Sequence, residues 1–410
     1  MLVIQNAMRT SLRELRTPTT GRRFLRTKQN ALPAAYYRGG TSRAVFFKEE
    51  HLPHDRKEWS SIFRGVIGSP DPYGRQLDGL GGGISSLSKI CVVGKSTHPD
   101  ADVDYTFVSL GIKDKDVDYS SNCGNMISAV GPFAVDSELF PVPLSEAGET
   151  DETVLVRIHN TNTGKIIHSR FPVVDGEAAT TGDFSIDGVA GTSARIRLDF
   201  INPAGSVTGM LLPTGSVTDK IDGAIVTCLD AGNPCVFADA AALGVNSDLS
   251  PQEIATHPTL LPRLDTIRRQ SGVKIGIAST VDNVPGSIPK ICLVGKPTSA
   301  GARDSQLGQD GDQVDILARA LSVGQPHKAV PITVALALAA AARVPGSVVA
   351  DVVGDQRRVD DAGLMIGHAS GNLLVGADFD EKGSLTSATV FRTARRLFEG
   401  TVFWKNESSI

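Results

Sequence analysis

The segments SLSKICVVGK (residues 86–95) and SIPKICLVGK (residues 287–296) decide the fold, because they are two copies of one sequence. Six of the seven residues from Lys89 to Lys95 recur from Lys290 onward, and the copies lie 201 positions apart. Each copy holds a short apolar run rich in β-branched residues, which predicts a buried β-strand. The repeat therefore predicts a chain built from two similar halves.

The residues around the two copies also match in kind. Strand-like VDYTFVSLG (103–111) and a cysteine loop precede one small-residue helix, whereas VDILARALSVG (314–324) and QPHKA (325–329) precede another, VPITVALALAAA (330–341). Further strands are predicted for VLVRIHN (154–160), KIIHSRF (165–171), ARIRLDF (194–200) and GAIVTCLD (223–230). We therefore expect an α+β fold with domains at 31–212 and 213–410, joined near LLPTGSVTD (211–219) and facing each other across a cleft.

Composition excludes several classes of protein. A chain of 410 residues with a net charge of −4 offers no clustered positive face for nucleic acid or an anionic membrane. No apolar run approaches the roughly 20 residues that span a bilayer. The five cysteines form no CxxC pair, so neither a disulfide framework nor a zinc site is supported, and a reducing compartment is expected.

Residues 1–30 differ from the rest of the chain, because seven Lys and Arg residues accompany one acid, Glu14. This composition is typical of a mitochondrial transit peptide, which predicts the mitochondrial matrix. The alternative is a solvated basic tail on a cytoplasmic protein. Under both interpretations the segment lies outside the fold.

The glycine-rich stretch LGGGISSLSK (80–89) has features of a nucleotide-binding loop and of a hydrolase motif. A dinucleotide-binding loop requires glycine where Ile84 stands, and the spacing of a P-loop is also absent. Ser86 and Lys89 match the Ser-x-x-Lys element of penicillin-binding hydrolases, but a strand follows and the partner motifs Ser-Asp-Asn and Lys-Thr-Gly do not occur. Ser86 is the one remaining argument for a hydrolase, which stays a weak alternative.

Lys89 and Cys123 are the residues best placed for chemistry. A lysine at the edge of an apolar strand could be held neutral and act as a general base, although a solvated loop lysine is the simpler interpretation. Asn122 is a good N-cap, and the turn at Gly124 and Asn125 leaves backbone N–H groups free to bind an anion beside the thiol. Pro132 is expected to kink or end this helix soon afterwards.

Four long motifs resemble those of the PrpF-type isomerases: YYRGGTSRAVFF (36–47), IGSPDPYGRQLDGLGGGISSLSK (67–89), DVDYTF (102–107) and NCGNMISAVGPFAVD (122–136). The family includes 2-methylaconitate cis–trans isomerase, aconitate Δ-isomerases and 4-oxalomesaconate tautomerase, and the likeness runs from about Ala31 to the C-terminus. It implies the diaminopimelate-epimerase-like fold, in which two pseudo-symmetric domains each wrap a mixed β-structure around a central helix. It also implies a homodimer and no cofactor or metal.

Carried over to this sequence, the resemblance makes Lys89 and Cys123 the catalytic residues. It assigns substrate binding to two groups, one in each half: Arg38, Gly40, Thr41, Ser42, Ser85, Ser86, Asn122, Gly124 and Asn125, and then Ser287, Lys290, His327 and Lys328. Epimerases of this architecture need two opposed thiols, but the second loop reads VGQPHKA (323–329) and has no cysteine. This departure argues against racemisation and for a proton shift within an unsaturated acid.

The sequence thus predicts a cofactor-independent isomerase of an unsaturated tricarboxylic acid, of the aconitate or 2-methylaconitate type, acting by allylic proton abstraction and reprotonation. One alternative is a keto-acid tautomerase such as 4-oxalomesaconate tautomerase. Another is a non-catalytic accessory protein of an iron–sulfur dehydratase.

Overall fold

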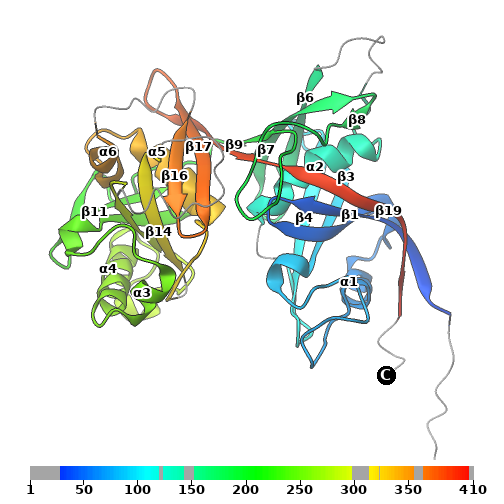
Figure 1. The fold of residues 1–410 in the computed structure, drawn as a ribbon, viewed down its shortest axis with the longest axis horizontal. Coiled ribbons are helices and arrows are strands. Elements are labelled where there is room, and N and C mark those ends of the chain that lie inside the picture. The colour runs from blue at the N-terminus through cyan, green and yellow to red at the C-terminus, as the bar shows by residue number, and fades with distance from the viewer. Residues whose placement is uncertain are drawn as a thin grey trace, which may run out of the picture.

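The computed structural model describes residues 28–119, 123–142, 152–297, 314–322, 324–354 and 363–405, which form the two lobes seen in Figure 1. The first lobe contains β1 (Asn30–Gly39), β2 (Ser42–Lys48), α1 (Trp59–Ile67), β3 (Lys89–Lys95), β4 (Val103–Leu110), β5 (Val117–Asp118), α2 (Gly124–Asp136), β6 (Glu152–Asn160), β7 (Lys165–Val174), β8 (Glu177–Ala178) and β9 (Ile196–Ile201). The second contains β10 (Asp219–Ile221), β11 (Ala224–Asp230), β12 (Pro234–Asp239), α3 (Pro251–Thr256), α4 (Leu260–Lys274), β13 (Lys290–Gly295), β14 (Ile316–Ser322), β15 (Gln325–Pro326), α5 (Ile332–Ala342), α6 (Val348–Val353), β16 (Leu364–His368), β17 (Gly371–Phe379) and β18 (Leu385–Arg392). The last strand, β19 (Ala394–Trp404), runs back to the first lobe.

The two lobes repeat one pattern of strand pairing. In the first, β3 is parallel to β2 and antiparallel to β4, while β6 is parallel to β4 and antiparallel to β7. In the second, β13 is parallel to β12 and antiparallel to β14, while β16 is parallel to β14 and antiparallel to β17. The repeated sequences are the equivalent strands β3 and β13. The predicted α+β class with two similar halves is confirmed.

Strand pairing continues across the boundary of the two lobes. The strand β9 pairs antiparallel with β18 of the second lobe, and the chain then continues into β10, which pairs with β11. In the same way β18 leads into β19, which pairs along its length with β1 of the first lobe. The boundary near residue 212 stays a prediction, and the predicted second domain, 213–410, includes a strand that packs in the first lobe.

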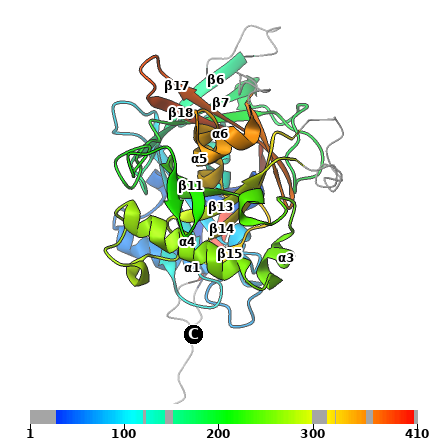
Figure 2. The same cartoon turned by 90° about the vertical axis from the view of Figure 1, so that its left-hand side faces the viewer.

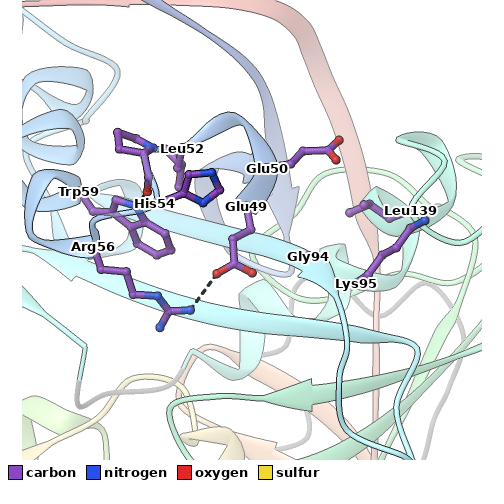
Figure 3. A pocket seen from close by; sticks show the side chains of 10 residues that line it. Glu49, Glu50, Leu52, His54, Arg56, Trp59, Gly94, Lys95 and Leu139 are labelled. Atoms are coloured by element: carbon purple, nitrogen blue, oxygen red, sulfur yellow. Dashed lines mark hydrogen bonds and ion pairs between the residues drawn. The ribbon is translucent and has the colours of Figure 1, made fainter.

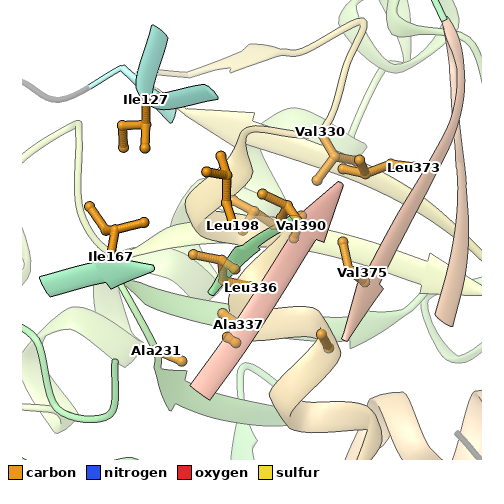
Figure 4. Packing of buried hydrophobic residues seen from close by; sticks show 14 of the residues in the cluster. Ile127, Ile167, Leu198, Ala231, Val330, Leu336, Ala337, Leu373, Val375 and Val390 are labelled. Atoms are coloured by element: carbon orange, nitrogen blue, oxygen red, sulfur yellow. The ribbon is translucent and has the colours of Figure 1, made fainter. Parts of the chain in front are cut away.

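One central helix lies in each lobe, as predicted. Helix α5 is apolar all round and its residues from Val334 to Ala341 are buried, which is the pattern of a helix enclosed on every side. Figure 2 shows α5 among the strands of the second lobe, with α3 and α4 outside them. Figure 4 shows Leu336 and Ala337 of this helix packed close to Leu198 and Val390 from the paired strands β9 and β18.

Helix α2 contains Pro132, which the sequence predicts to kink the helix or end it soon afterwards, and the helix ends at Asp136. Proline removes one helical hydrogen bond, yet every residue from Met126 to Val135 is buried against surrounding strands. Packing of the helix in the core therefore outweighs the lost bond.

Two findings bear on localisation. No helix in the described ranges is long and apolar enough to cross a membrane. Residues 1–27 of the basic segment predicted as a transit peptide lie outside the described residues.

The connection between the lobes depends on the buried carboxylate of Asp230. It accepts hydrogen bonds from the hydroxyl groups of Ser206 and Thr208, at 2.6 and 2.9 Å, and from the backbone N–H groups of Val207 and Thr208, each at 2.8 Å. Asp230→Ala removes the buried acceptor of these four hydrogen bonds, whose donors are partly buried or exposed, and is expected to cost about 1.5–3 kcal/mol of unfolding free energy. Urea unfolding measures this loss. The exposed Glu381→Ala is the control and should change stability by less than about 0.5 kcal/mol; an equal effect for both would contradict this role of Asp230.

Candidate active site

The N-terminus of α2 meets the N-terminus of α5 at the boundary of the lobes. Cys123 is the N-cap residue of α2, with extended backbone and a half-buried side chain. A Cβ atom on Gly124 would lie 2.6 Å from Cδ1 of Ile332, the first residue of α5. Only glycine allows this approach. Helix N-termini present free N–H groups and a partial positive charge, so the junction is suited to an anion.

Lys89 is the first residue of β3 and is only 7% exposed. Its Nζ atom lies 5.1 Å from the centroid of the Phe107 ring. Within the described part of the chain, no acidic side chain forms an ion pair with it. The amine is therefore held in largely apolar surroundings at the start of the repeated strand.

Cys123 is coupled to a buried group beside Lys89. The Cys91 thiol donates to the hydroxyl oxygen of Tyr105 at 3.9 Å. Burial raises the pKa of Cys91, and the charge of Cys123 adds to this increase, whereas that of Lys89 opposes it. Burial likewise raises the pKa of Tyr105, with smaller contributions from both thiols. Lys89 and Cys123 are thus both within electrostatic range of the buried Cys91 thiol, which is hydrogen-bonded to Tyr105. The complete burial of Cys91 agrees with the expectation that it serves packing.

The segment from Arg38 to Ser42 lies against the first turn of α2. Gly40 has a φ of 50°, and a Cβ there would lie 2.4 Å from Oδ1 of Asn125. The Asn125 amide donates to the Thr41 hydroxyl at 3.1 Å. Ser42 is buried at the start of β2, and Asn122 lies outside the described residues. Arg38 donates through Nη1 to the Gly40 carbonyl and to both oxygens of Thr393, at 3.0–3.1 Å.

The loop before Lys89 is held by Gln76, which sequence reasoning missed. Its Oε1 accepts from the Ser88 hydroxyl and from the Gly83 N–H, each at 2.8 Å, and its Nε2 donates to the Ser69 hydroxyl at 2.9 Å. Gln76 is buried and has a φ of 54°, a backbone conformation uncommon for its residue type. The predicted residues Ser85 and Ser86 lie in the short turn that this network supports, Ser85 exposed and Ser86 half-buried.

In the second lobe, Lys290 lies beside the start of α5. Its Nζ donates to the Thr333 hydroxyl at 3.5 Å, a contact that the sequence did not indicate. Partial burial and the charge of Lys290 lower the pKa of His327, so His327 also lies near this lysine. Ser287 and Lys328 are exposed, and among the described residues no hydrogen bond or ion pair connects either side chain to Lys290 or His327.

Two cavities lie away from this group of residues. One, of about 310 Å³, is lined by residues that include Glu49, Arg56 and Lys95, and Figure 3 shows the ion pair between Arg56 and Glu49 within it. The other, of about 670 Å³, is lined by Asp239 and Lys296 among others. Lys95 and Lys296 follow the glycines at the ends of the repeated strands, opposite Lys89 and Lys290. The cleft expected between the lobes stays a prediction.

Metal ligands do not gather in the structure. Across the described ranges, no three His, Cys, Asp or Glu side chains are grouped as a metal ion requires.

Comparison with known proteins agrees with the geometry. Residues 29–405 match the family model described as PrpF protein. The chain is 38% identical to "3-methylitaconate isomerase" of Eubacterium barkeri, covering 92% of this chain and 97% of the relative. It is 37% identical to "2-methyl-aconitate isomerase" of Cupriavidus necator, covering 91% and 97%.

A solved structure shares the whole fold. The crystal structure of methylitaconate-delta-isomerase superposes with a TM-score of 0.83 at 37% identity, covering 93% of this chain and 97% of that one. The predicted diaminopimelate-epimerase-like fold is confirmed.

Proposed function

The chain belongs to the PrpF family and is an isomerase of unsaturated acids, and we propose that it isomerises an unsaturated tricarboxylic acid of the aconitate or 2-methylaconitate type without a cofactor. Lys89 is the base in this proposal. The observation that carries it is the burial of Lys89 in β3, without an acidic partner in the described residues, on the same strand as the buried Cys91 and within electrostatic range of its thiol.

The proposed reaction begins when the Lys89 amine removes a proton from the carbon next to the double bond. The electron pair left on that carbon delocalises through the double bond into a carboxylate. An uncharged amine is required for this step. The developing negative charge would face the N-termini of α2 and α5 and the hydroxyl groups of Thr41 and Ser86.

The proton then returns to the molecule. Reprotonation at the far end of the delocalised system moves the double bond, whereas rotation before reprotonation converts cis into trans. No electron is gained or lost, so the reaction balances without a redox partner. Cys123 borders the same group and is the second proposed catalytic residue, able to deliver a proton from its thiol. Lys290 and His327 would bind a carboxylate from the side of the second lobe.

One assay tests the proposed function. Chelator-treated protein is incubated in heavy water with cis-aconitate, trans-aconitate, the 2-methylaconitates and oxalomesaconate, and the products are followed by proton NMR. We expect isomerisation of at least one tricarboxylate, with deuterium incorporated at the carbon that gains the proton. Turnover of oxalomesaconate alone would instead support a tautomerase, and no turnover of any compound would support an accessory protein.

A further inference from the structure

Arg392 is a buried arginine at the boundary of the lobes. It is the last residue of β18 and is 9% exposed. Side chains alternate along a strand, so it lies on the same face as Ala388 and Val390, which pack in the main core. Figure 4 shows Val390 within this cluster. A guanidinium therefore continues a column of apolar side chains.

Most N–H donors of this guanidinium have no acceptor among the described residues. In the described ranges its one hydrogen bond runs from Nη1 to the carbonyl of the preceding residue, Phe391, at 3.0 Å. Arg319 is similarly buried, at 6% exposure, but donates to the carbonyls of Leu249, Ala318 and Gly367. A guanidinium has five N–H donors, and buried charges are normally paired. Among the described residues, Arg392 is thus a buried arginine most of whose N–H donors have no acceptor.

The electrostatic surroundings of Arg392 are also uncompensated. Burial lowers its pKa to about 10, which leaves it positively charged at neutral pH. The neighbouring His368 is uncharged at neutral pH, because burial and the charges of Arg392 and Arg319 lower its pKa to about 4. None of the carboxylates in the described residues forms an ion pair with Arg392.

The fold itself does not require a cation at this position. In the first lobe Ile158 pairs with Ile167, which pairs with Phe200. In the second lobe, Ile366 pairs with Leu373 in the same way. Val375 pairs with Val390, and continuing this register by two residues along each strand places Leu373 opposite Arg392. Phe200 in the first lobe therefore occupies the position equivalent to that of Arg392 in the second lobe.

The backbone next to Arg392 reaches the candidate site. The carbonyl of Thr393 accepts from the Gly40 N–H at 2.9 Å and from Arg38 at 3.1 Å. Gly40 in turn lies against Asn125 in the first turn of α2. Arg38 holds this turn through Nη1. Arg392 directly precedes Thr393 in the chain, and most of its own donors have no acceptor among the described residues.

We propose that Arg392 binds one carboxylate of the substrate, while the helix N-termini at the lobe boundary bind another. The inference rests on the proposed function and assigns one carboxylate of its tricarboxylate substrate to Arg392. A planar guanidinium matches a carboxylate through two parallel N–H···O bonds, and the ligand would supply the missing counter-charge.

Calorimetric titration with propane-1,2,3-tricarboxylate tests the proposal, because this saturated acid has no double bond to move. We expect Arg392→Met to raise Kd by about 10- to 100-fold, the effect of losing a charged hydrogen-bonded contact. The matched control is Arg195→Met, since the exposed Arg195 lies over the Phe391 ring and carries the same charge nearby. It should bind as the wild type does.

Two dicarboxylates identify the contact. Glutarate lacks the central carboxylate and methylsuccinate lacks a terminal one. For the analogue without the Arg392-bound group, Arg392→Met and wild type should bind equally. Wild-type affinity of Arg392→Met for the tricarboxylate, or equal weakening in Arg195→Met, would overturn the proposal.

The stability of the ligand-free protein separates binding from a structural role. Removing an unpaired buried charge should leave the unfolding midpoint unchanged or higher. A lower unfolding midpoint for ligand-free Arg392→Met than for the wild type would show that Arg392 stabilises the fold, and this would count against the proposal. Because the test uses binding alone, an inactive wild type that still binds through Arg392 would refute the proposed isomerisation and leave this inference intact.

Discussion

Replacing Lys89 with methionine is expected to lower kcat by about 10²- to 10⁴-fold, the usual contribution of a positioned general base. Methionine keeps the apolar volume of the buried stem but cannot accept a proton, so the fold should be retained. KM should change little if the amine acts on the proton rather than on a carboxylate. Steady-state kinetics on the substrate identified by NMR measures both constants.

Two other lysines serve as matched controls. Lys290 begins the equivalent strand and contacts Thr333. We expect Lys290→Met to raise KM by about 10- to 100-fold with kcat retained, as for loss of a charged contact to a bound anion. Lys95, exposed at the far end of β3, should be neutral when changed to methionine. Loss of kcat with unchanged KM in Lys290→Met would reverse the proposed roles of the two lysines.

Gly124→Ala is expected to lower kcat/KM by about 100-fold, because misplacing catalytic groups by about 1 Å has an effect of this size. Its Cβ would lie 2.6 Å from Cδ1 of Ile332 and within 3.0 Å of Cβ and Cγ2 of the same side chain. The N-termini of α2 and α5 must therefore move apart. Steady-state kinetics measures the loss of kcat/KM, and urea unfolding should show a cost of about 1–3 kcal/mol for the overpacking.

A second change supplies the control for Gly124→Ala. Ile332→Ala removes Cδ1 and Cγ2, two of the three atoms that the new methyl group would meet, and leaves Cβ. The double variant should therefore recover part of the activity lost in Gly124→Ala. If the double variant is no more active than Gly124→Ala, the close approach of the two helices is not what the glycine protects.

The fold followed from the sequence where the signal was local. The apolar runs of β3 and β13 are strands because each has a buried, β-branched core, and their repetition indicated the two lobes. The course of β19 could not be predicted. Its partner β1 lies at the other end of the described chain, and an alternating strand pattern does not reveal which lobe it joins.

The candidate site was only partly visible in the sequence. Lys89 and Cys123 stood out because of the motifs around them. Gln76 did not, because its role depends on a positive φ and on contacts with Ser69 and Ser88 that arise only in the folded loop. Arg392 gave no signal either, since its burial and its unused donors follow from the pairing of β18 with β9.

Chemical rescue tests the central claim, that the Lys89 amine removes the allylic proton. Lys89→Ala leaves space for a small amine, and exchange of the allylic hydrogen of the substrate with heavy water is followed by proton NMR with and without ethylamine. The account predicts no enzymatic exchange without the amine and a rate that rises with its concentration, while Lys290→Ala shows no such dependence. Exchange by Lys89→Ala at the wild-type rate without ethylamine would contradict it.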